Sequence, residues 1–343
     1  MGMQRVTNVD TVLTGITTTG TPHIGNYVGA IRPAVIASLD TNATSFYFLA
    51  DYHSLVKSGD AAQVASSTLE IAASWLASGL SSEATLYRQS DVPEIMELAW
   101  ILTCMTAKGL MNRAHAYKAA VADNESHGNK DRDKGINMGL FCYPVLMAAD
   151  ILMFKANKVP VGKDQIQHVE MARDIAGRFN HHYGETFVLP EAVVNQNTAV
   201  LPGLDGRKMS KSYDNTIPLF SEEKSLRKMI MKIKTNSQEP GEPKDPDTSA
   251  LFSIYRAFSS DKESFLIRQK YLEGIGWGEM KQMLFECLNE QLKEPRKEYK
   301  RLMAEPDYVE NLLQKGAIRA REVSQPFMSE IRAAVGLRSL ALD

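Results

Sequence analysis

Two separate segments of this sequence carry residue types that suit phosphate chemistry, and the first spans residues 15–29. It holds glycines at three positions five residues apart, together with His23 and Asn26. Glycine lets the backbone approach a ligand closely, and the free N–H groups at the start of a helix favour an anion. The segment matches neither a Walker A loop nor G-x-G-x-x-G, so a dinucleotide site is not supported. Alone, it is equally well interpreted as a glycine-rich turn with a lone histidine.

The second segment, residues 204–212, places Lys208 and Lys211 around a small polar centre. Lysine is a compact charge on a flexible stem, which suits phosphate oxygens that move and separate. Residues 205–236 hold eight basic and four acidic residues, a local excess of four positive charges. A solvated charged loop would show the same excess, so the charge alone does not establish a site.

The elements that must position these segments form an α/β pattern. Short apolar runs alternate with longer segments in which apolar residues recur at helical spacing. This pattern is typical of a doubly wound, parallel, Rossmann-like sheet. We predict strands and helices at these residues: strands 12–14, 45–50, 84–87 and 158–161; helices 64–76, 95–105 and 165–182. Polar or proline-rich loops are predicted at 123–135 and 236–249. After residue 251 the pattern is helical, with a last helix over 323–335, so a smaller all-helical domain follows.

Length and composition set the outer limits of the interpretation. The 343 residues indicate about two domains, and 39 basic against 41 acidic residues give a net charge of −2. With 44% hydrophobic and 23% charged residues, bulk disorder, collagen and coiled coil are excluded. There is no transmembrane run and no signal-peptide core, and the three distant cysteines form neither a disulfide framework nor a metal-ligand pair. We therefore expect a cytoplasmic protein that does not associate with a membrane.

The domain organisation follows from these patterns. We expect a Rossmann-like catalytic domain over residues 1–215, with an inserted segment at about 92–150 and the lysine loop at 205–215. A helical domain over 216–320 would follow, and a C-terminal helix over 321–343 would pack back on the catalytic domain.

Together the two segments resemble the paired signatures of class I aminoacyl-tRNA synthetases. His23-Ile24-Gly25-Asn26 is similar to the HIGH signature, and Lys208-Met209-Ser210-Lys211-Ser212 is the KMSKS signature, 185 positions later. Within class I the chain looks like the tryptophanyl-tRNA synthetase family, in which Asn26 replaces the second histidine. Matching stretches lie at residues 15–30, 143–152, 159–168 and 173–180.

The resemblance implies a reaction and its partners. ATP activates L-tryptophan to tryptophanyl-adenylate with release of pyrophosphate, and the tryptophan then passes to tRNA(Trp). Mg²⁺ would come with the ATP phosphates, with no metal ligand from protein side chains. The family also implies a homodimer, for which residues 95–111 are a candidate interface, and anticodon contacts from about residues 218–312.

The resemblance also implies which residues hold ATP. His23, Asn26, Lys208 and Lys211 are the candidate catalytic residues. The ATP-binding residues would be Thr17, Thr18, Thr19, Gly25, Asn26, Gly162, Lys163, Asp164, Val200, Lys208, Met209, Ser210, Lys211 and Ser212. Asp164 would accept the ribose hydroxyl protons, although a helix N-cap before Gln165 is the alternative. Thr17 stands where the family commonly has glutamine, and the loop lysines Lys118, Lys130 and Lys134 are equal candidates for contacting pyrophosphate.

The amino-acid pocket is expected around Asp150, which lies in an otherwise apolar stretch and so needs a hydrogen-bond donor. By resemblance that donor is the indole N–H, although capping or pairing within the helix is the alternative. The remaining pocket residues would be Tyr143, Met147, Val159 and Val161 as walls, with Gln165 and His53 at the polar end. Plain core packing is the alternative for Met147, Val159 and Val161.

Three other functions compete with this interpretation. A tyrosyl-tRNA synthetase shares the architecture and a pocket aspartate. A small-molecule nucleotidyltransferase would act without tRNA, and a non-catalytic paralogue would act by binding alone. Asn26 and residues 159–168 favour tryptophan over tyrosine, and the intact lysines and aspartates argue against the paralogue.

Overall fold

The computed structural model describes residues 9–57, 59–194 and 200–338, and its centre is a five-stranded sheet. All strand pairs are parallel, in the order β3-β2-β1-β4-β5. The strands are β1 (Asp10–Thr17), β2 (Ala43–Ala50), β3 (Thr85–Arg88), β4 (Lys158–Val161) and β5 (Glu191–Val194). Four of them confirm the predicted strands. The fifth, β5, was not predicted.

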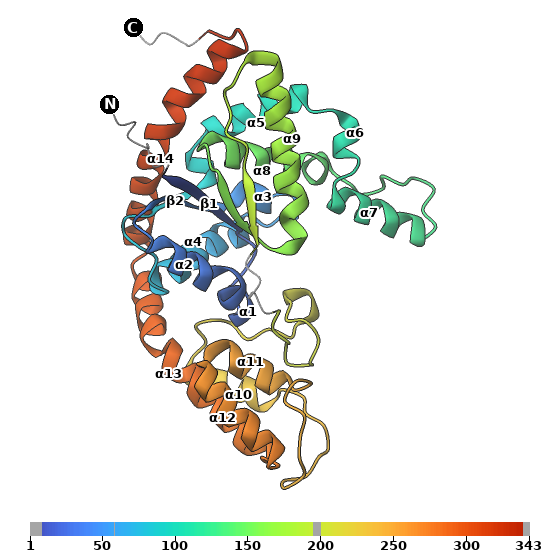
Figure 1. Ribbon diagram of the computed structural model, residues 1–343, viewed down its shortest axis with the longest axis vertical. Coiled ribbons are helices and arrows are strands. Elements are labelled where there is room, and N and C mark those ends of the chain that lie inside the picture. The colour runs from blue at the N-terminus through green and yellow to red at the C-terminus, as the bar shows by residue number, and fades with distance from the viewer. Residues whose placement is uncertain (1–8, 58, 195–199, 339–343) are drawn as a thin grey trace, which may run out of the picture.

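Helices cover both faces of the sheet, as the α/β pattern predicts (Figure 1). Phe46 and Phe48 of β2 join one core, while Tyr47 and Leu49 join the other, because successive side chains of a strand point to opposite faces. The first core includes α5 (Glu94–Met105), α8 (Met138–Met153) and α9 (Ile166–Tyr183); the second includes α2 (Arg32–Ser38) and α4 (Ala61–Ala77).

The strand order reverses between β1 and β4. The chain moves from β1 outward through β2 to β3 and then returns to β4 on the other side of β1. In open parallel sheets, ligands bind at the carboxyl ends of the strands where the order reverses. The segments that follow β1 and β4, which hold the threonine run and Asp164, therefore meet at one edge.

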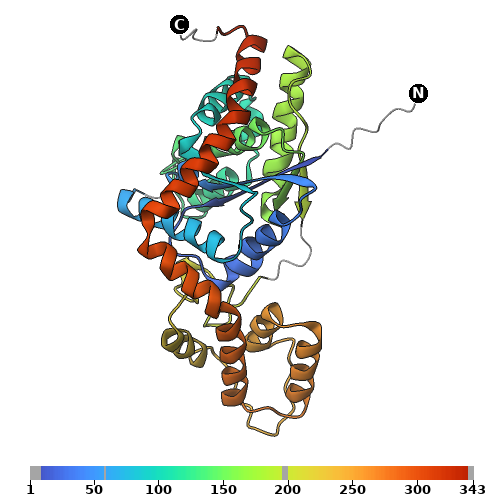
Figure 2. The same cartoon turned by 90° about the vertical axis from the view of Figure 1, so that its left-hand side faces the viewer.

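Helices dominate the described residues after the sheet domain, as predicted. They are α10 (Glu223–Met231), α11 (Ala250–Phe258), α12 (Asp261–Leu272), α13 (Trp277–Ala304) and α14 (Pro306–Ala334). Figure 2 shows α13 and α14 running from the helical region along one side of the molecule. α14 lies directly against β3, since a Cβ added at Gly316 would sit 1.6 Å from the carbonyl oxygen of Leu86. The expected boundary at residue 320 therefore falls inside a single helix that begins at Pro306.

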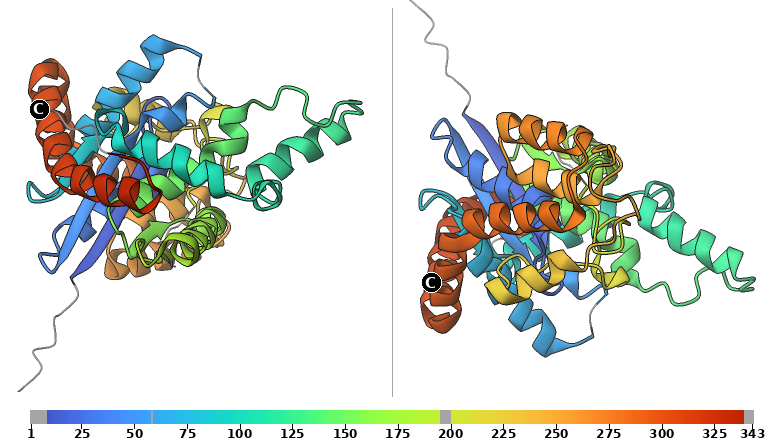
Figure 3. Two further views of the ribbon diagram at one scale, coloured as in Figure 1. Left: turned by 90° about the horizontal axis from the view of Figure 1, so that it is seen from above. Right: turned by 90° about the horizontal axis from the view of Figure 1, so that it is seen from below.

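Several short helices connect these elements. They are α1 (Ile24–Asn26), α3 (Asp51–Ser54), α6 (Lys108–Met111) and α7 (His115–Ser126). α7 extends four residues into the stretch predicted as a loop from residue 123. Figure 3 shows this part of the inserted segment projecting away from the body as an arm. Within the described ranges, the helices include none that is long and apolar enough to cross a membrane.

Candidate active site

His23 and Asn26 form a reciprocal cap at the start of α1. The Asn26 N–H donates to His23 Nδ1 at 3.2 Å, and the His23 N–H donates to Asn26 Oδ1 at 3.1 Å. Burial, together with the nearby charge of Lys211, lowers the pKa of His23 from 6.5 to about 4. The imidazole is therefore neutral at pH 7, as it must be for Nδ1 to accept a hydrogen bond. The two signature residues fix each other and the helix N-terminus.

The lysine loop lies against the segment that follows β1. Lys211 Nζ donates to the carbonyl oxygen of Thr19, and Lys211 also lies beside Gly20. Backbone pairing fixes this approach, because Ile24 N donates to Ile217 O at 3.0 Å and Leu219 N donates to Pro22 O at 2.9 Å. The structure thus brings together the two segments that the sequence singles out.

Asn215 organises the lysine loop from beneath, and the sequence interpretation missed it. Its side chain donates to Asp205 Oδ1 at 2.7 Å and to Lys208 O at 3.1 Å, and accepts from Ser210 N at 2.8 Å. Asn215 is buried, and a Cβ at Gly203 would collide with it. Met209 is likewise buried and packs under the His23–Asn26 turn rather than lying open to a ligand.

Lys208 lies in different surroundings from Lys211. It lines a cavity of about 610 Å³ between the loop and the helical region, together with Val200, Lys234 and Trp277. The structure therefore places Val200 with Lys208, and Lys211 with the threonine run. Of that run, Thr17 and Thr19 are exposed and Thr18 is buried. Ser210 and Ser212 contact each other through their hydroxyls at 2.8 Å.

A chain of hydrogen bonds begins in the turn after β4 and reaches α8. Gln165 Nε2 donates to Asp164 Oδ2 at 2.9 Å, and Gln165 Oε1 lies 2.9 Å from His168 Nδ1. His168 Nε2 lies 2.6 Å from the hydroxyl of Tyr143, whose pKa burial and the charge of Asp164 raise to about 12. Since an amide oxygen only accepts, His168 Nδ1–H donates to Gln165 and Nε2 accepts the Tyr143 proton. The chain joins a predicted ATP residue to two predicted tryptophan residues.

Asp150 is completely buried on α8 and both its oxygens have partners. His53 Nε2 lies 2.9 Å from Oδ2, and Gln89 Nε2 donates to Oδ1 at 2.7 Å. Burial raises the pKa of Asp150, and the hydrogen bonds from His53 and Gln89 oppose that rise. The protein itself thus supplies the donors that this carboxylate requires, although each oxygen retains a lone pair for another donor.

The remaining predicted residues fall into two groups. Val159 is buried among core residues, which agrees with its core-packing alternative, whereas Met147 and Val161 are half-buried beside that core. Gly162, Lys163 and Asp164 are exposed in the turn after β4. A Cβ at Gly162 would lie 2.7 Å from Asp164 Oδ1, so the glycine leaves room for the carboxylate.

Sequence comparison decides the family to which this arrangement belongs. A family model described as class I tRNA synthetases (W and Y) matches residues 7–293. The chain belongs to the class I tRNA synthetases. The chain is 62% identical over 333 residues to the tryptophan–tRNA ligase of Pseudomonas aeruginosa, covering 96% of this chain and 74% of that one. It is 57% identical to the tryptophan–tRNA ligase of Neisseria meningitidis, covering 96% and 98%.

A solved class I tRNA synthetase agrees with the fold as well as the sequence. The tryptophanyl-tRNA synthetase of Campylobacter jejuni, in complex with ADP and tryptophan, has a TM-score of 0.85 and 44% identity, over 95% of this chain and all of that one. The family match confirms the prediction made from the two signatures. It also excludes the alternative that this chain is a small-molecule nucleotidyltransferase from an unrelated family.

Proposed function

We propose that this class I tRNA synthetase is a tryptophan–tRNA ligase. A carboxylate oxygen of L-tryptophan attacks the α-phosphorus of ATP, the bond to the β-phosphate oxygen breaks, and pyrophosphate leaves. The terminal ribose hydroxyl of tRNA(Trp) then attacks the acyl carbon, and AMP leaves. The observation that carries the choice of tryptophan is the 57–62% identity to tryptophan–tRNA ligases over almost the whole chain.

The pocket around Asp150 supplies a physical reason for that choice. We propose that the indole N–H donates to a free lone pair of the Asp150 carboxylate. Its other lone pairs accept hydrogen bonds from His53 and Gln89. A buried acceptor left without its donor is costly, so such a site rejects an analogue that lacks the N–H by about 10⁴-fold. Tyr143 and Met147 would line the ring, and Gln165 would contact the amino-acid backbone.

The ATP side is assigned to the crevice between β1 and β4. Thr17, Thr19 and Gly162 are exposed residues that can approach the nucleotide, and Asp164 can accept the ribose hydroxyl protons. Lys211 stabilises the charge that develops on the phosphates, and Lys208 joins it if the loop turns from its cavity toward the crevice. Mg²⁺ is proposed to bind the phosphate oxygens, since it keeps most of its shell as phosphate and water in such sites.

The larger assembly is also a proposal. On helix α5, the side chains of Trp100 and Met96 are 68% and 41% exposed. Met138, the first residue of α8, is also 68% exposed. Large apolar side chains of this kind are typical of an interface, so we propose a homodimer through α5. The helical region would contact the tRNA anticodon. The three cysteines are unpaired, which agrees with a reducing, cytoplasmic location.

Amino-acid-dependent ATP–pyrophosphate exchange tests the function. The purified protein is assayed with tryptophan, tyrosine and phenylalanine, and charging of a tRNA(Trp) transcript follows. We expect exchange with tryptophan that exceeds tyrosine by at least about 10³-fold in kcat/KM. Exchange with tyrosine alone would assign the pocket to the other branch of the family, and no exchange with any of the three would exclude synthetase activity.

A further inference from the structure

Gln89 contacts Asp150, the proposed acceptor of the indole N–H. It is fully buried at the end of β3, and its Nε2 donates to Asp150 Oδ1 at 2.7 Å. In the part of the chain that the structure describes, its Oε1 is buried and has no hydrogen-bond partner. The amide is therefore held through Nε2 alone, and its position depends on the turn that carries it.

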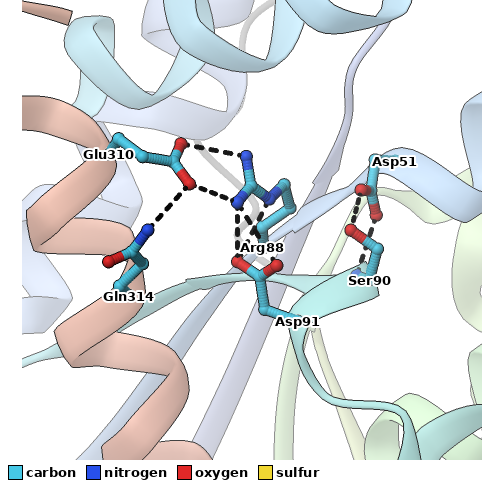
Figure 4. Close-up of polar contacts among 6 residues, drawn as sticks. All are labelled: Asp51, Arg88, Ser90, Asp91, Glu310 and Gln314. Atoms are coloured by element: carbon cyan, nitrogen blue, oxygen red, sulfur yellow. Dashed lines mark hydrogen bonds and ion pairs between the residues drawn. The ribbon is translucent and has the colours of Figure 1, made fainter. Parts of the chain in front are cut away.

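That turn, Gln89–Asp91, is anchored from outside by Arg88 (Figure 4). Arg88 donates to both oxygens of Asp91, at 3.1 and 3.2 Å, which closes the turn. It also donates to both oxygens of Glu310 on α14, at 3.1 and 2.6 Å. Gln314, one helical turn on, donates to Glu310 at 3.4 Å. A planar guanidinium thus links the end of β3 to a helix 222 positions later.

Asp51 ties the same turn to α3. Its carboxylate accepts from the Ser90 N–H at 3.1 Å and from the Ser90 hydroxyl. α3 also carries His53, the second partner of Asp150. The Asp51–Ser90 contact therefore holds together the two elements whose side chains approach the two oxygens of Asp150.

We propose that Gln89 is a specificity-determining positioning residue for tryptophan: it fixes the orientation of Asp150, and Glu310 acts through Arg88 to hold it there. The inference rests on the proposed function, in which Asp150 accepts the indole N–H. With the Nε2 donor gone, the carboxylate loses one of its two anchors and can turn away from the indole. The hydrogen bond from Gln89 also opposes protonation of Asp150, and a protonated carboxyl is a poorer acceptor.

The two residues should differ in the size of their effect. Gln89 is fully buried and touches Asp150 directly, whereas the side chains of Arg88 and Glu310 are 25% and 40% exposed. They line a cavity of about 810 Å³ in which water screens the pair. Loss of Gln89 should therefore disturb recognition strongly, and loss of the Glu310 charge should disturb it weakly.

The test compares tryptophan with 3-(1-benzothiophen-3-yl)alanine, in which sulfur replaces the indole N–H. For Gln89→Met we expect the ratio of kcat/KM values, tryptophan over analogue, to fall by about tenfold or more. The KM for tryptophan should rise and the KM for ATP should stay within twofold. For Glu310→Gln the ratio should fall by about two- to threefold, with Glu310→Asp recovering part of it.

A matched variant separates positioning from loss of helix docking. Glu97→Gln breaks the pair between Glu97 of α5 and Arg332 of α14, whose side chains are 36% and 30% exposed. It should leave the tryptophan-to-analogue ratio unchanged. An unchanged ratio in folded Gln89→Met overturns the inference, and a fall in Glu97→Gln equal to that in Glu310→Gln overturns the role of Glu310. Failure of the proposed function differs from both, because the wild-type protein would then show no tryptophan-dependent exchange.

Discussion

The two sides of the proposed site are built in opposite ways. On the ATP side, Thr17, Thr19 and Lys211 are exposed, and so is the turn after β4. On the tryptophan side, Asp150 and Gln89 are completely buried, and every oxygen of the carboxylate has a partner. One side offers charge and backbone at a surface, and the other offers a prearranged hydrogen-bond network.

The difference follows from what each side must recognise. Phosphates carry full charges that move apart during the reaction, and a flexible lysine can follow them at a surface. An indole carries one weak N–H donor, which gains selectivity only where an unpaired acceptor would be costly. We conclude that the exposed side should tolerate movement, whereas the buried side should depend on position.

The strongest test of this comparison removes the charge on the exposed side. Lys211→Ala should lower kcat/KM for ATP–pyrophosphate exchange by about 10²- to 10³-fold, because a prearranged positive charge at the developing phosphate charge is lost. Tryptophan binding, measured by equilibrium dialysis without ATP, should stay within twofold. Lys262→Ala, at an exposed position of α12, is the control and should change neither quantity. Equal losses of exchange and of tryptophan affinity in Lys211→Ala would show that the two sides are not separable.

Local sequence patterns indicate the residues of the exposed side more directly than they indicate the contacts of the buried side. The glycine turn and the lysine loop are contiguous segments, and their residue types show their chemistry directly. Gln89 and Asp150 are 61 positions apart, and Arg88 and Glu310 are 222 apart. The periodicity within one helix or strand cannot indicate a contact between residues so far apart. The role of Asn215 was not predicted for the same reason, since only the structure shows its three contacts.

The errors in the fold have similar causes. β5 is four residues long and partly exposed at an edge of the sheet, and its apolar run of three residues, 192–194, is shorter than the run of about four to eight residues that predicts a strand. The predicted final helix, 323–335, covers only the last part of α14, which begins at Pro306 and packs against β3. The sequence pattern after residue 251 is helical throughout, so it does not show where one helix ends and the next begins.

A pH titration tests whether the turn beneath the exposed side is itself rigid. His23 has a pKa of about 4 in the folded protein, below the ordinary histidine value of 6.5. As the pH falls, His23 is therefore protonated in the unfolded state at a higher pH than in the folded state. The free energy of unfolding should fall by up to about 3 kcal/mol between about pH 6.5 and pH 4. His23→Asn keeps a capping oxygen but has no proton to bind. The difference between wild type and His23→Asn in urea unfolding, measured from pH 4 to 7, should show this slope, and parallel curves would contradict it.

The smallest expected effect concerns the contact between α14 and the buried side. Gly316→Ala places a methyl group where the backbone of Leu86 lies, 1.6 Å away, so helix and strand must separate. We expect a loss of about 1–3 kcal/mol in urea unfolding. Gly177→Ala is the matched control in α9, where an added Cβ would enter open space, and should stabilise by about 0.5–1 kcal/mol. Because β3 leads into the turn that carries Gln89, Gly316→Ala should also raise the KM for tryptophan more than the KM for ATP. Equal rises in the two KM values would mean that α14 supports the ATP side and the tryptophan side to the same extent. The two sides would then differ only in how deeply their residues are buried.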